Sequence, residues 1–225
     1  MATTTPASPS STCPTESSPS TIPPPGLLNP SLRTLSNPIL KDTITFLSYS
    51  AETQGACTRL RVRCAPGGGT PPHYHTTYTE RFITPATLPA STPLTITIDD
   101  TTHKLHSGAE ATVPIDTVHS FRNDNDDETG DVEFEVQIEP GNEGFEKSLY
   151  ILYGLAREGQ VDAQGVPKRF SQLCLIAEMG DLSRPGWLRD VGRGVVWAGA
   201  RWARWWGEER ELVERFWGKG RGGAG

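Results

Sequence analysis

Two short segments of the chain carry the side chains that most limit how it can fold. The first offers His73 and His75, followed by Glu80, and the second offers His119. Alternate side chains of an extended strand share a face, so His73 and His75 are expected to point the same way. Glu80 stands at an odd spacing from His75, so a turn through 76–77 must reset the register if the carboxylate is to join them. Three imidazoles and one carboxylate form a ligand set for a divalent transition metal.

Period-two alternation of apolar and polar residues predicts several short strands. It is found at 57–64, 93–98, 118–123 and 131–139. The last of these alternates without a break, which is typical of an antiparallel strand with one buried face. Many short strands separated by Gly, Pro and Asp turns predict a sandwich or barrel, of which the jelly roll is one form. This part of the chain is therefore expected to be mainly β.

The two ligand-bearing segments resemble the two sequence motifs of the cupin superfamily. The motif G-x5-H-x-H-x4-E-x6-G is matched by Gly67, His73, His75 and Glu80. The motif G-x5-P-x-G-x2-H-x3-N is matched by Gly108, Pro114, His119 and Asn123. The resemblance covers about residues 40–140. It implies a double-stranded β-helix, the jelly-roll barrel of cupins, with one metal held by His73, His75, Glu80 and His119.

Two positions depart from those motifs. Thr87 and Asp116 stand where the family has turn glycines. The proline-rich run 85–93 is interpreted as an enlarged loop in place of the first glycine, and Asp116 as a turn residue that tolerates an unusual backbone angle. The two remaining histidines, His103 and His106, are expected in a solvent-facing turn outside the site.

Composition and periodicity divide the chain into four parts. Residues 1–38 are rich in Ser, Thr and Pro, and are predicted to form a disordered tail because they offer too little apolar surface to offset the cost of ordering. The cupin barrel is expected over 39–143. Helical spacing predicts a helical extension over 144–217, and 218–225 is expected to be a flexible glycine-rich end.

The extension is predicted to hold helices at 145–158, 169–179 and about 185–217, the last of which contains all six tryptophans. Apolar residues of the third helix step by three and four positions through Leu188, Val191, Val195, Ala198, Trp202, Trp205, Leu212 and Phe216. Three interpretations stay open. The apolar face packs on the barrel or a partner subunit, or the Trp/Arg-rich helix lies in a membrane interface, or the segment is poorly ordered. Four glutamates between 208 and 214 weigh against the membrane interpretation.

Composition also bears on partners and location. The net charge is −6 and the ligand-bearing part has no basic face, so nucleic acid is not expected as a partner. No apolar run has the length of a membrane span, and no secretory or transit peptide pattern is present. The four cysteines form no C-x-x-C pair and are expected to be reduced, so a cytoplasmic protein is predicted. The cupin resemblance implies a homodimer, since cupins commonly pair through their sheets.

Apolar walls are expected around the metal. The candidates for substrate contact fall on inward faces of the predicted strands, with core packing as the alternative for each, and are Phe46, Phe82, Phe121 and Phe134. Such walls suit a small organic substrate, aromatic or polyketide-derived, better than a sugar phosphate. Tyr150 and Tyr153 on the first helix are candidates to close the mouth.

Three functions are compatible with these features. The first is a metal-dependent, dioxygenase-like oxidoreductase with Glu80 as catalytic residue, since small single-domain cupins of fungal type include oxidoreductases of polyketide pathways in secondary metabolism. Iron is the preferred metal, while Mn, Ni, Cu and Zn also suit nitrogen and oxygen ligands. The second is a non-redox isomerase, lyase or cyclase in which the metal is a Lewis acid. The third is a non-catalytic cupin that binds a small molecule.

Overall fold

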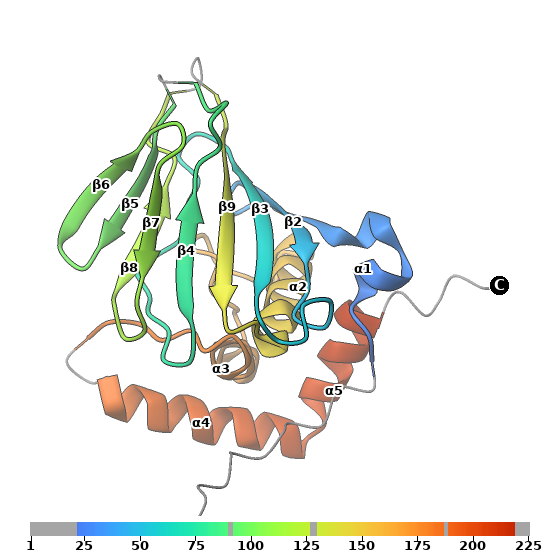
Figure 1. The fold of residues 1–225 in the computed structure, drawn as a ribbon. Helices are drawn as coiled ribbons and strands as arrows, with labels where there is room; N and C mark the ends of the chain where they lie inside the picture. The colour runs from blue at the N-terminus through green and yellow to red at the C-terminus, as the bar shows by residue number, and fades with distance from the viewer. Residues whose placement is uncertain (1–21, 90–91, 127–129, 187–188, 219–225) are drawn as a thin grey trace, which may run out of the picture.

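Two antiparallel sheets form the barrel in the computed structural model, which describes residues 22–89, 92–126, 130–186 and 189–218 (Figure 1). The large sheet has the strand order β1-β2-β3-β9-β4-β7 and the small sheet the order β6-β5-β8. The strands are β1 (Thr34–Asn37), β2 (Asp42–Ser48), β3 (Thr58–Cys64), β4 (Thr79–Ile83), β5 (Leu94–Ile98), β6 (Thr101–Leu105), β7 (Glu110–Val113), β8 (His119–Arg122) and β9 (Val132–Glu139). The prediction of a mainly β jelly-roll barrel followed by helices is confirmed.

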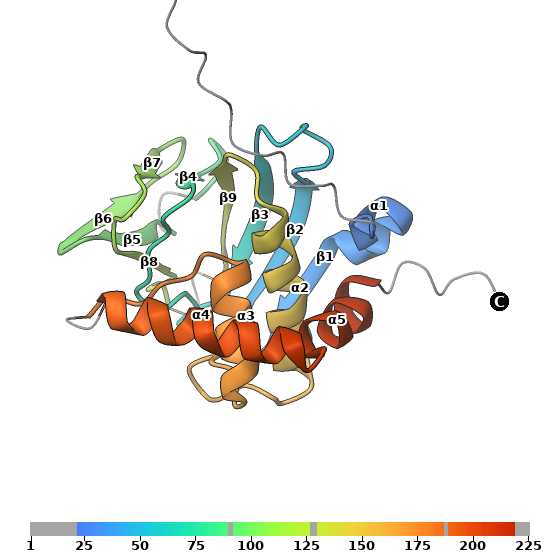
Figure 2. The same ribbon diagram turned by 90° about the horizontal axis from the view of Figure 1, so that it is seen from below.

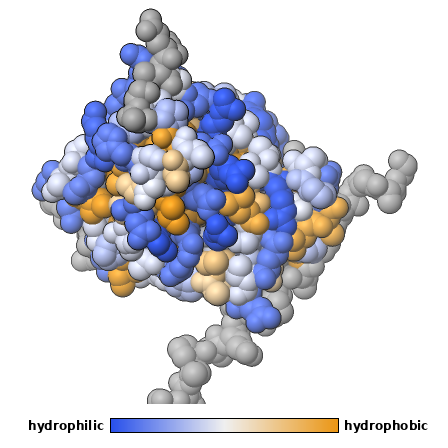
Figure 3. Space-filling model, turned by 45° about the horizontal axis from the view of Figure 1, so that its top comes forward, coloured by the Kyte–Doolittle hydropathy of each residue, from blue (hydrophilic) through white to orange (hydrophobic). Residues whose placement is uncertain are grey.

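Alternation located the strands to within one residue at β3, β5, β8 and β9. The outward side chains of β3 pair with acidic groups on its neighbour, for example Arg59 with Glu135 at 2.6 Å and Arg63 with Asp131 at 2.6 Å. Figure 3 accordingly shows a largely hydrophilic face with scattered hydrophobic residues. The inward side chains of the same strands are buried.

Residues 22–37 are ordered, which corrects the predicted disorder of 1–38. They form the short helix α1 (Pro25–Leu28), the 3-10 turn η1 (Pro30–Arg33) and β1, which pairs antiparallel with β2. Trp217 secures the beginning of this segment, because its Nε1 donates to the carbonyl of Ile22 at 3.0 Å. The low apolar content of 22–37 suggested disorder, but this segment is ordered because it adds to a sheet and a core that other parts of the chain build. The rest of the predicted tail, 1–21, lies outside the described residues.

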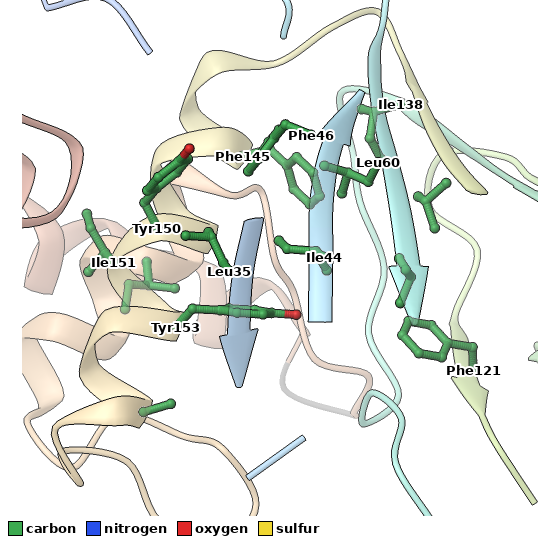
Figure 4. Close-up of a cluster of buried hydrophobic side chains, with 14 of the residues drawn as sticks. Leu35, Ile44, Phe46, Leu60, Phe121, Ile138, Phe145, Tyr150, Ile151 and Tyr153 are labelled. Carbon is green, nitrogen blue, oxygen red and sulfur yellow. The ribbon is translucent and has the colours of Figure 1, made fainter. Parts of the chain in front are cut away.

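Helices α2 (Glu143–Arg157) and α3 (Phe170–Met179) lie against the half of the large sheet that the small sheet does not cover (Figure 2). Both lie within two residues of their predicted bounds. Asn142 directly precedes α2, and its side chain caps the helix by accepting a hydrogen bond from the backbone N–H of Phe145 at 3.0 Å. Figure 4 shows Tyr153 pointing from α2 across β1 toward β2. The helices therefore close the barrel on this side.

A carboxylate is buried where α2 begins. Glu146 is fully buried, and its Oε1 accepts hydrogen bonds from Ser50 N–H and the Thr58 hydroxyl, both at 2.6 Å. Its Oε2 has no hydrogen-bond partner among the described residues. Burial raises the pKa of the Glu146 carboxyl to about 7, although the bonds from Thr58 and Ser50 lower it.

We expect Glu146→Gln to stabilise the protein in mildly alkaline solution. A folded-state pKa raised above the unfolded value means that the folded protein binds more protons, so the charged carboxylate destabilises the fold increasingly as pH rises from about 4.5 to about 7. The amide keeps an acceptor oxygen without that charge. Unfolding by urea should show a gain of about 1–3 kcal/mol at pH 8 and almost none at pH 4. An equal effect at both pH values would contradict a buried charge.

The third predicted helix is divided. α4 (Arg189–Trp205) ends before Gly207, which has a φ of 80°, and is followed by α5 (Glu208–Leu212) and the π-helical turn η2 (Val213–Trp217). The predicted single helix is thus interrupted at Gly207. Leu212 and Phe216 are buried as predicted.

The buried face of α4 is not the predicted one. Val195, Trp202 and Trp205 are exposed, whereas Ala200 and Ala203 are fully buried against α3. A Cβ added at Gly199 would lie 2.5 Å from Cys174 Sγ, so the two helices are too close for large side chains at their contact. Both faces of α4 carry apolar residues at helical spacing, and they differ only in the size of those residues. Spacing alone therefore favoured the face with the larger side chains. The side chains of Leu188 and Val191 lie outside the described residues.

Among the described residues, no helix combines the length and the apolar character needed to cross a membrane.

Candidate metal centre

The four predicted ligands meet at one point of the barrel. One ligand atom from each of His73, His75, Glu80 and His119 lies within 4.8 Å of the others. Glu80 comes from β4 and His119 from the start of β8, while His73 and His75 come from the segment before β4. Glu80 Oε2 lies 2.8 Å from His119 Nε2 and 3.2 Å from His75 Nε2. The structure therefore brings together the set that spacing predicted.

Backbone pairing holds the two histidine segments beside each other. His73 N–H donates to His119 O at 3.0 Å, and His119 N–H donates to His73 O at 2.8 Å. The approach needs glycine at 69, because a Cβ there would lie 2.3 Å from the carbonyl oxygen of Phe121. Asp116, in place of the family glycine, has a φ of 62°, so the expected unusual backbone angle is confirmed.

Each histidine presents the same nitrogen to the centre. Each Nδ1 is hydrogen-bonded to a backbone carbonyl oxygen. The partners are Pro71 for His73 at 2.8 Å, Asp181 for His75 at 3.0 Å and Thr117 for His119 at 3.0 Å. A carbonyl can only accept, so each Nδ1 carries a proton and leaves Nε2 as the ligand atom of the neutral ring. In a protonated ring of His75 or His119, Nε2–H donates to Glu80 Oε2. Hydrogen bonds of this kind fix ring orientation in metal sites. The donor set fits a metal ion before any ion is bound.

The electrostatics favour the charge states that ligands need. Burial would raise the pKa of the Glu80 carboxyl, but hydrogen bonds from His119 and His75 outweigh it and hold this pKa well below its usual range. Burial, with the neighbouring His119 and His75, lowers the pKa of His73 to about 3. Burial also lowers the pKa of His119, but Glu80 more than compensates and raises it. Glu80 is thus an anion and His73 a neutral ligand near pH 7.

One residue that organises the centre was not found from the sequence. The Asp181 carboxylate accepts hydrogen bonds from the backbone N–H groups of Thr76 and Thr77 at 2.6 and 2.7 Å and from both hydroxyls at 2.9 and 2.8 Å. These are the residues of the expected turn between His75 and Glu80. Asp181 also supplies the carbonyl that orients His75. It follows α3, about a hundred residues away in sequence, and no local pattern points to it.

We expect Asp181→Asn to weaken metal binding by about tenfold, because the turn that sets Glu80 against His75 loses its charged acceptor while the carbonyl on His75 stays. Asn tolerates the positive φ of 49° at this position. The affinity would be measured by competition with a chromophoric chelator. Asp99→Asn is the matched control, since Asp99 has a φ of 50° in the turn between β5 and β6 and is not one of the four ligand residues. Equal affinity of the Asp181 variant and the wild type would refute this role.

A cavity of about 920 Å³ adjoins the centre. His73, His75 and Glu80 form part of its wall. The rest is mainly apolar, with Ile44, Leu60 and Val136 from the barrel and Leu152, Val196 and Trp197 from the helices. Its size and character are those of sites for drug-sized organic molecules.

Of the four phenylalanines predicted as substrate contacts, Phe121 lines this cavity and Phe46, Phe82 and Phe134 do not. These three are almost completely buried in the barrel core, so the alternative of core packing holds for them. Tyr153 lines the cavity, whereas Tyr150 bonds to Tyr49 and to the carbonyl of Leu32. The helical part of the wall, including Leu152 and Trp197, was missed because no strand pattern marks it.

The two other histidines lie outside the centre. His103 is in β6 and not in a turn, and both His103 and His106 are exposed as expected. Asn123, the last residue of the second motif, donates to the carbonyls of Cys64 and Gly130 at 2.8 and 3.1 Å. It therefore joins strand ends and does not reach the ligands.

Comparison with known proteins gives a partial picture. No family model matches the chain, and no curated protein does. Among solved structures, KdgF from Halomonas sp. is 12% identical, with 46% of this chain and 82% of that chain covered and a TM-score of 0.38. An RmlC-like cupin from Shewanella frigidimarina is 12% identical over 49% and 86%, with a TM-score of 0.39. The polyketide cyclase RemF from Streptomyces resistomycificus is 18% identical over 44% and 65%, with a TM-score of 0.36.

These likenesses are too low to bear on the reaction. The fold class is assigned from features of this chain. These are two antiparallel sheets in jelly-roll order and, between them, a centre of three histidines and one glutamate. The protein therefore has the jelly-roll barrel that its resemblance to the cupin motifs implied.

Proposed function

We propose that the protein is a metal-dependent, dioxygenase-like oxidoreductase acting on a small aromatic or polyketide-derived molecule of secondary metabolism. The observation that carries the proposal is the position of the four-ligand centre beside a large, mainly apolar cavity, with His73, His75 and Glu80 on its wall. A metal at such a wall meets an organic substrate directly.

The donor set supports iron as the metal. It offers three imidazole nitrogens and one carboxylate, without thiolate, which suits Fe(II) and also Mn, Ni, Cu and Zn. When bound, a redox-active ion would supply one-electron chemistry with dioxygen, and its net positive charge would lower the pKa of a bound hydroxyl.

The chain's own groups prepare that chemistry. Glu80 is the single anion of the set and is 7% exposed, so water has little access to it. Its Oε2 holds the Nε2 atoms of His75 and His119 in place. The apolar walls exclude bulk water from the substrate, which strengthens electrostatic interactions at the centre.

A non-redox isomerase, lyase or cyclase would use the same centre, and oxygen consumption separates the two. Protein loaded anaerobically with Fe(II) would be mixed with a panel of phenols and polyketide aromatics in an oxygen electrode. Oxygen uptake that depends on the substrate and disappears in Glu80→Ala supports the proposal. Product formation without oxygen uptake would favour the non-redox reaction, and tight binding without any product would favour a binding cupin.

A further inference from the structure

A second polar group faces the cavity away from the metal ligands. Asp42, at the start of β2, lines the cavity although its side chain is only 5% exposed. Tyr153, which also lines the cavity, donates its hydroxyl to Asp42 Oδ2 at 2.7 Å. Asp42 Oδ1 has no hydrogen-bond partner among the described residues.

An unsatisfied buried carboxylate oxygen costs free energy, so its place on a cavity wall needs an explanation. Burial raises the pKa of the Asp42 carboxyl to about 6, although the Tyr153 hydroxyl lowers it. The neighbouring wall residue on β2, Ile44, is apolar and offers Oδ1 no donor. A group on a bound molecule can supply one once a small side-chain shift exposes Oδ1, which is otherwise buried at the cavity wall.

Strand pairing places Asp42 and Glu80 at different ends of the cavity. Asp42 pairs with Cys64 at one end of β3, whereas Glu80 pairs with Ile138, which pairs with Thr58 at the other end of β3. The offset is six residues along β3, or roughly 20 Å of strand. Apolar side chains, among them Ile44, Leu60 and Val62, lie between the two carboxylates on the wall.

From this arrangement we propose that Asp42, held by Tyr153, is a specificity-determining residue that accepts a hydrogen bond from a hydroxyl or N–H group on the ligand. The ligand then has an apolar body with a hydrogen-bond donor at the end away from the metal. Binding at Asp42 does not need the metal, so the inference rests on the proposed function only in naming the ligand a substrate.

The test compares two probes that differ in one donor, 2-naphthol and 2-methoxynaphthalene, titrated calorimetrically into metal-free and metal-loaded protein. Wild type should bind 2-naphthol about tenfold more tightly than the methyl ether, in both forms. Asp42→Asn should lose most of this preference, since the charged acceptor is gone. Ile44→Val, on the same strand and cavity wall, should lower the affinity for both probes equally and so keep the preference for 2-naphthol.

Tyr153→Phe separates a binding role from a structural one. It frees the second oxygen of Asp42, so the preference for 2-naphthol should persist or grow even though the protein is less stable. Equal affinity of wild type for the two probes, or an unchanged preference in Asp42→Asn, would overturn the inference. Loss of metal binding with the preference intact would instead count against the proposed function alone.

An independent observation concerns the exposed side of α4 and Trp206, which directly follows the helix. Trp197, Trp202, Trp205 and Trp206, here called the tryptophan face, are 56%, 58%, 78% and 66% exposed. Large aromatic side chains are rarely left in water together on one helix. From 191 to 207 the chain has three arginines and no acidic residue, in a protein of net charge −6. Arg201 also stacks over Trp197, with Cζ 5.2 Å from the ring centroid.

We infer that the tryptophan face binds a membrane surface that carries anionic lipids. Tryptophan favours the interface between headgroups and acyl chains, and arginine favours anionic headgroups. Of the glutamates that follow, Glu208 pairs with Arg169, and Glu209 shares Arg204 with Glu178, so the attraction to lipid rests on Arg193 and Arg201. Trp197 and Val196 also line the cavity, so an apolar ligand would pass from the lipid to the cavity beside α4.

Co-sedimentation with phosphatidylcholine vesicles, with and without phosphatidylserine, tests this inference. Wild type should bind the anionic vesicles, and Trp202→Ser with Trp205→Ser should reduce binding by at least about tenfold. Leu28→Ser, which removes an apolar side chain of 49% exposure from α1, is the control and should bind as wild type does. Absence of vesicle binding, with a dimer in light scattering that the double variant dissociates, would assign the face to a second copy and overturn the inference.

Discussion

Replacing His75 with alanine is expected to lower the affinity for the bound metal by more than about 100-fold and to abolish turnover. His75 is 3% exposed, supplies one Nε2 to the centre, and has its Nδ1 fixed by the Asp181 carbonyl. No other described side chain is placed to replace that nitrogen in the four-residue set. Elemental mass spectrometry of protein reconstituted with iron would give the metal content per chain.

His103→Ala controls for the loss of an imidazole anywhere on the protein. His103 lies in β6 and is exposed, so its removal should leave the metal content unchanged. His119→Ala should reproduce the effect of His75→Ala, because both rings share Glu80 Oε2. A His75 variant that keeps full metal content and turnover would show that the four side chains do not act as one centre.

The ligands were predictable because their geometry is local. His73 and His75 share a face through strand periodicity, and Glu80 follows after a short turn, so spacing alone limits where their side chains can go. What fixes that turn is not local. The Asp181 carboxylate reaches Thr76 and Thr77 from the loop after α3, and sequence periodicity says nothing about contacts between such distant segments.

The cavity wall was harder to predict than the barrel. Inward-facing positions of strands could be read from alternation, but a side chain such as Phe82 faces inward and still lies in packed core. Whether an inward position meets a cavity depends on which element covers it. Here α2 and α4 contribute Leu152, Tyr153 and Trp197, and the position of these helices follows from tertiary packing.

Substituting Gly154 by valine is expected to destabilise the protein by about 3 kcal/mol, because the new side chain overpacks the contact of α2 with the C-terminal turn. Gly154 interrupts an otherwise helical apolar pattern in α2. A Cβ there would lie 2.2 Å from Cδ1 and Cε1 of Phe216, which is 3% exposed. Phe216 belongs to η2, next to the buried Trp217 that holds Ile22, so its displacement also loosens the N-terminal segment. Urea unfolding would give the free-energy change.

Gly194→Val in α4 is the matched control, since a Cβ at this helical glycine meets nothing within 4 Å. Valine has a slightly better helix propensity than glycine, so this variant should be neutral or more stable by a few tenths of a kcal/mol. The double variant Gly154→Val with Phe216→Ala should lose less stability than the sum of the two single losses, because alanine at 216 removes the ring that clashes with the new valine. Strict additivity of the two substitutions would mean that Gly154 is not required for the approach of Phe216, and that its place in α2 has another cause.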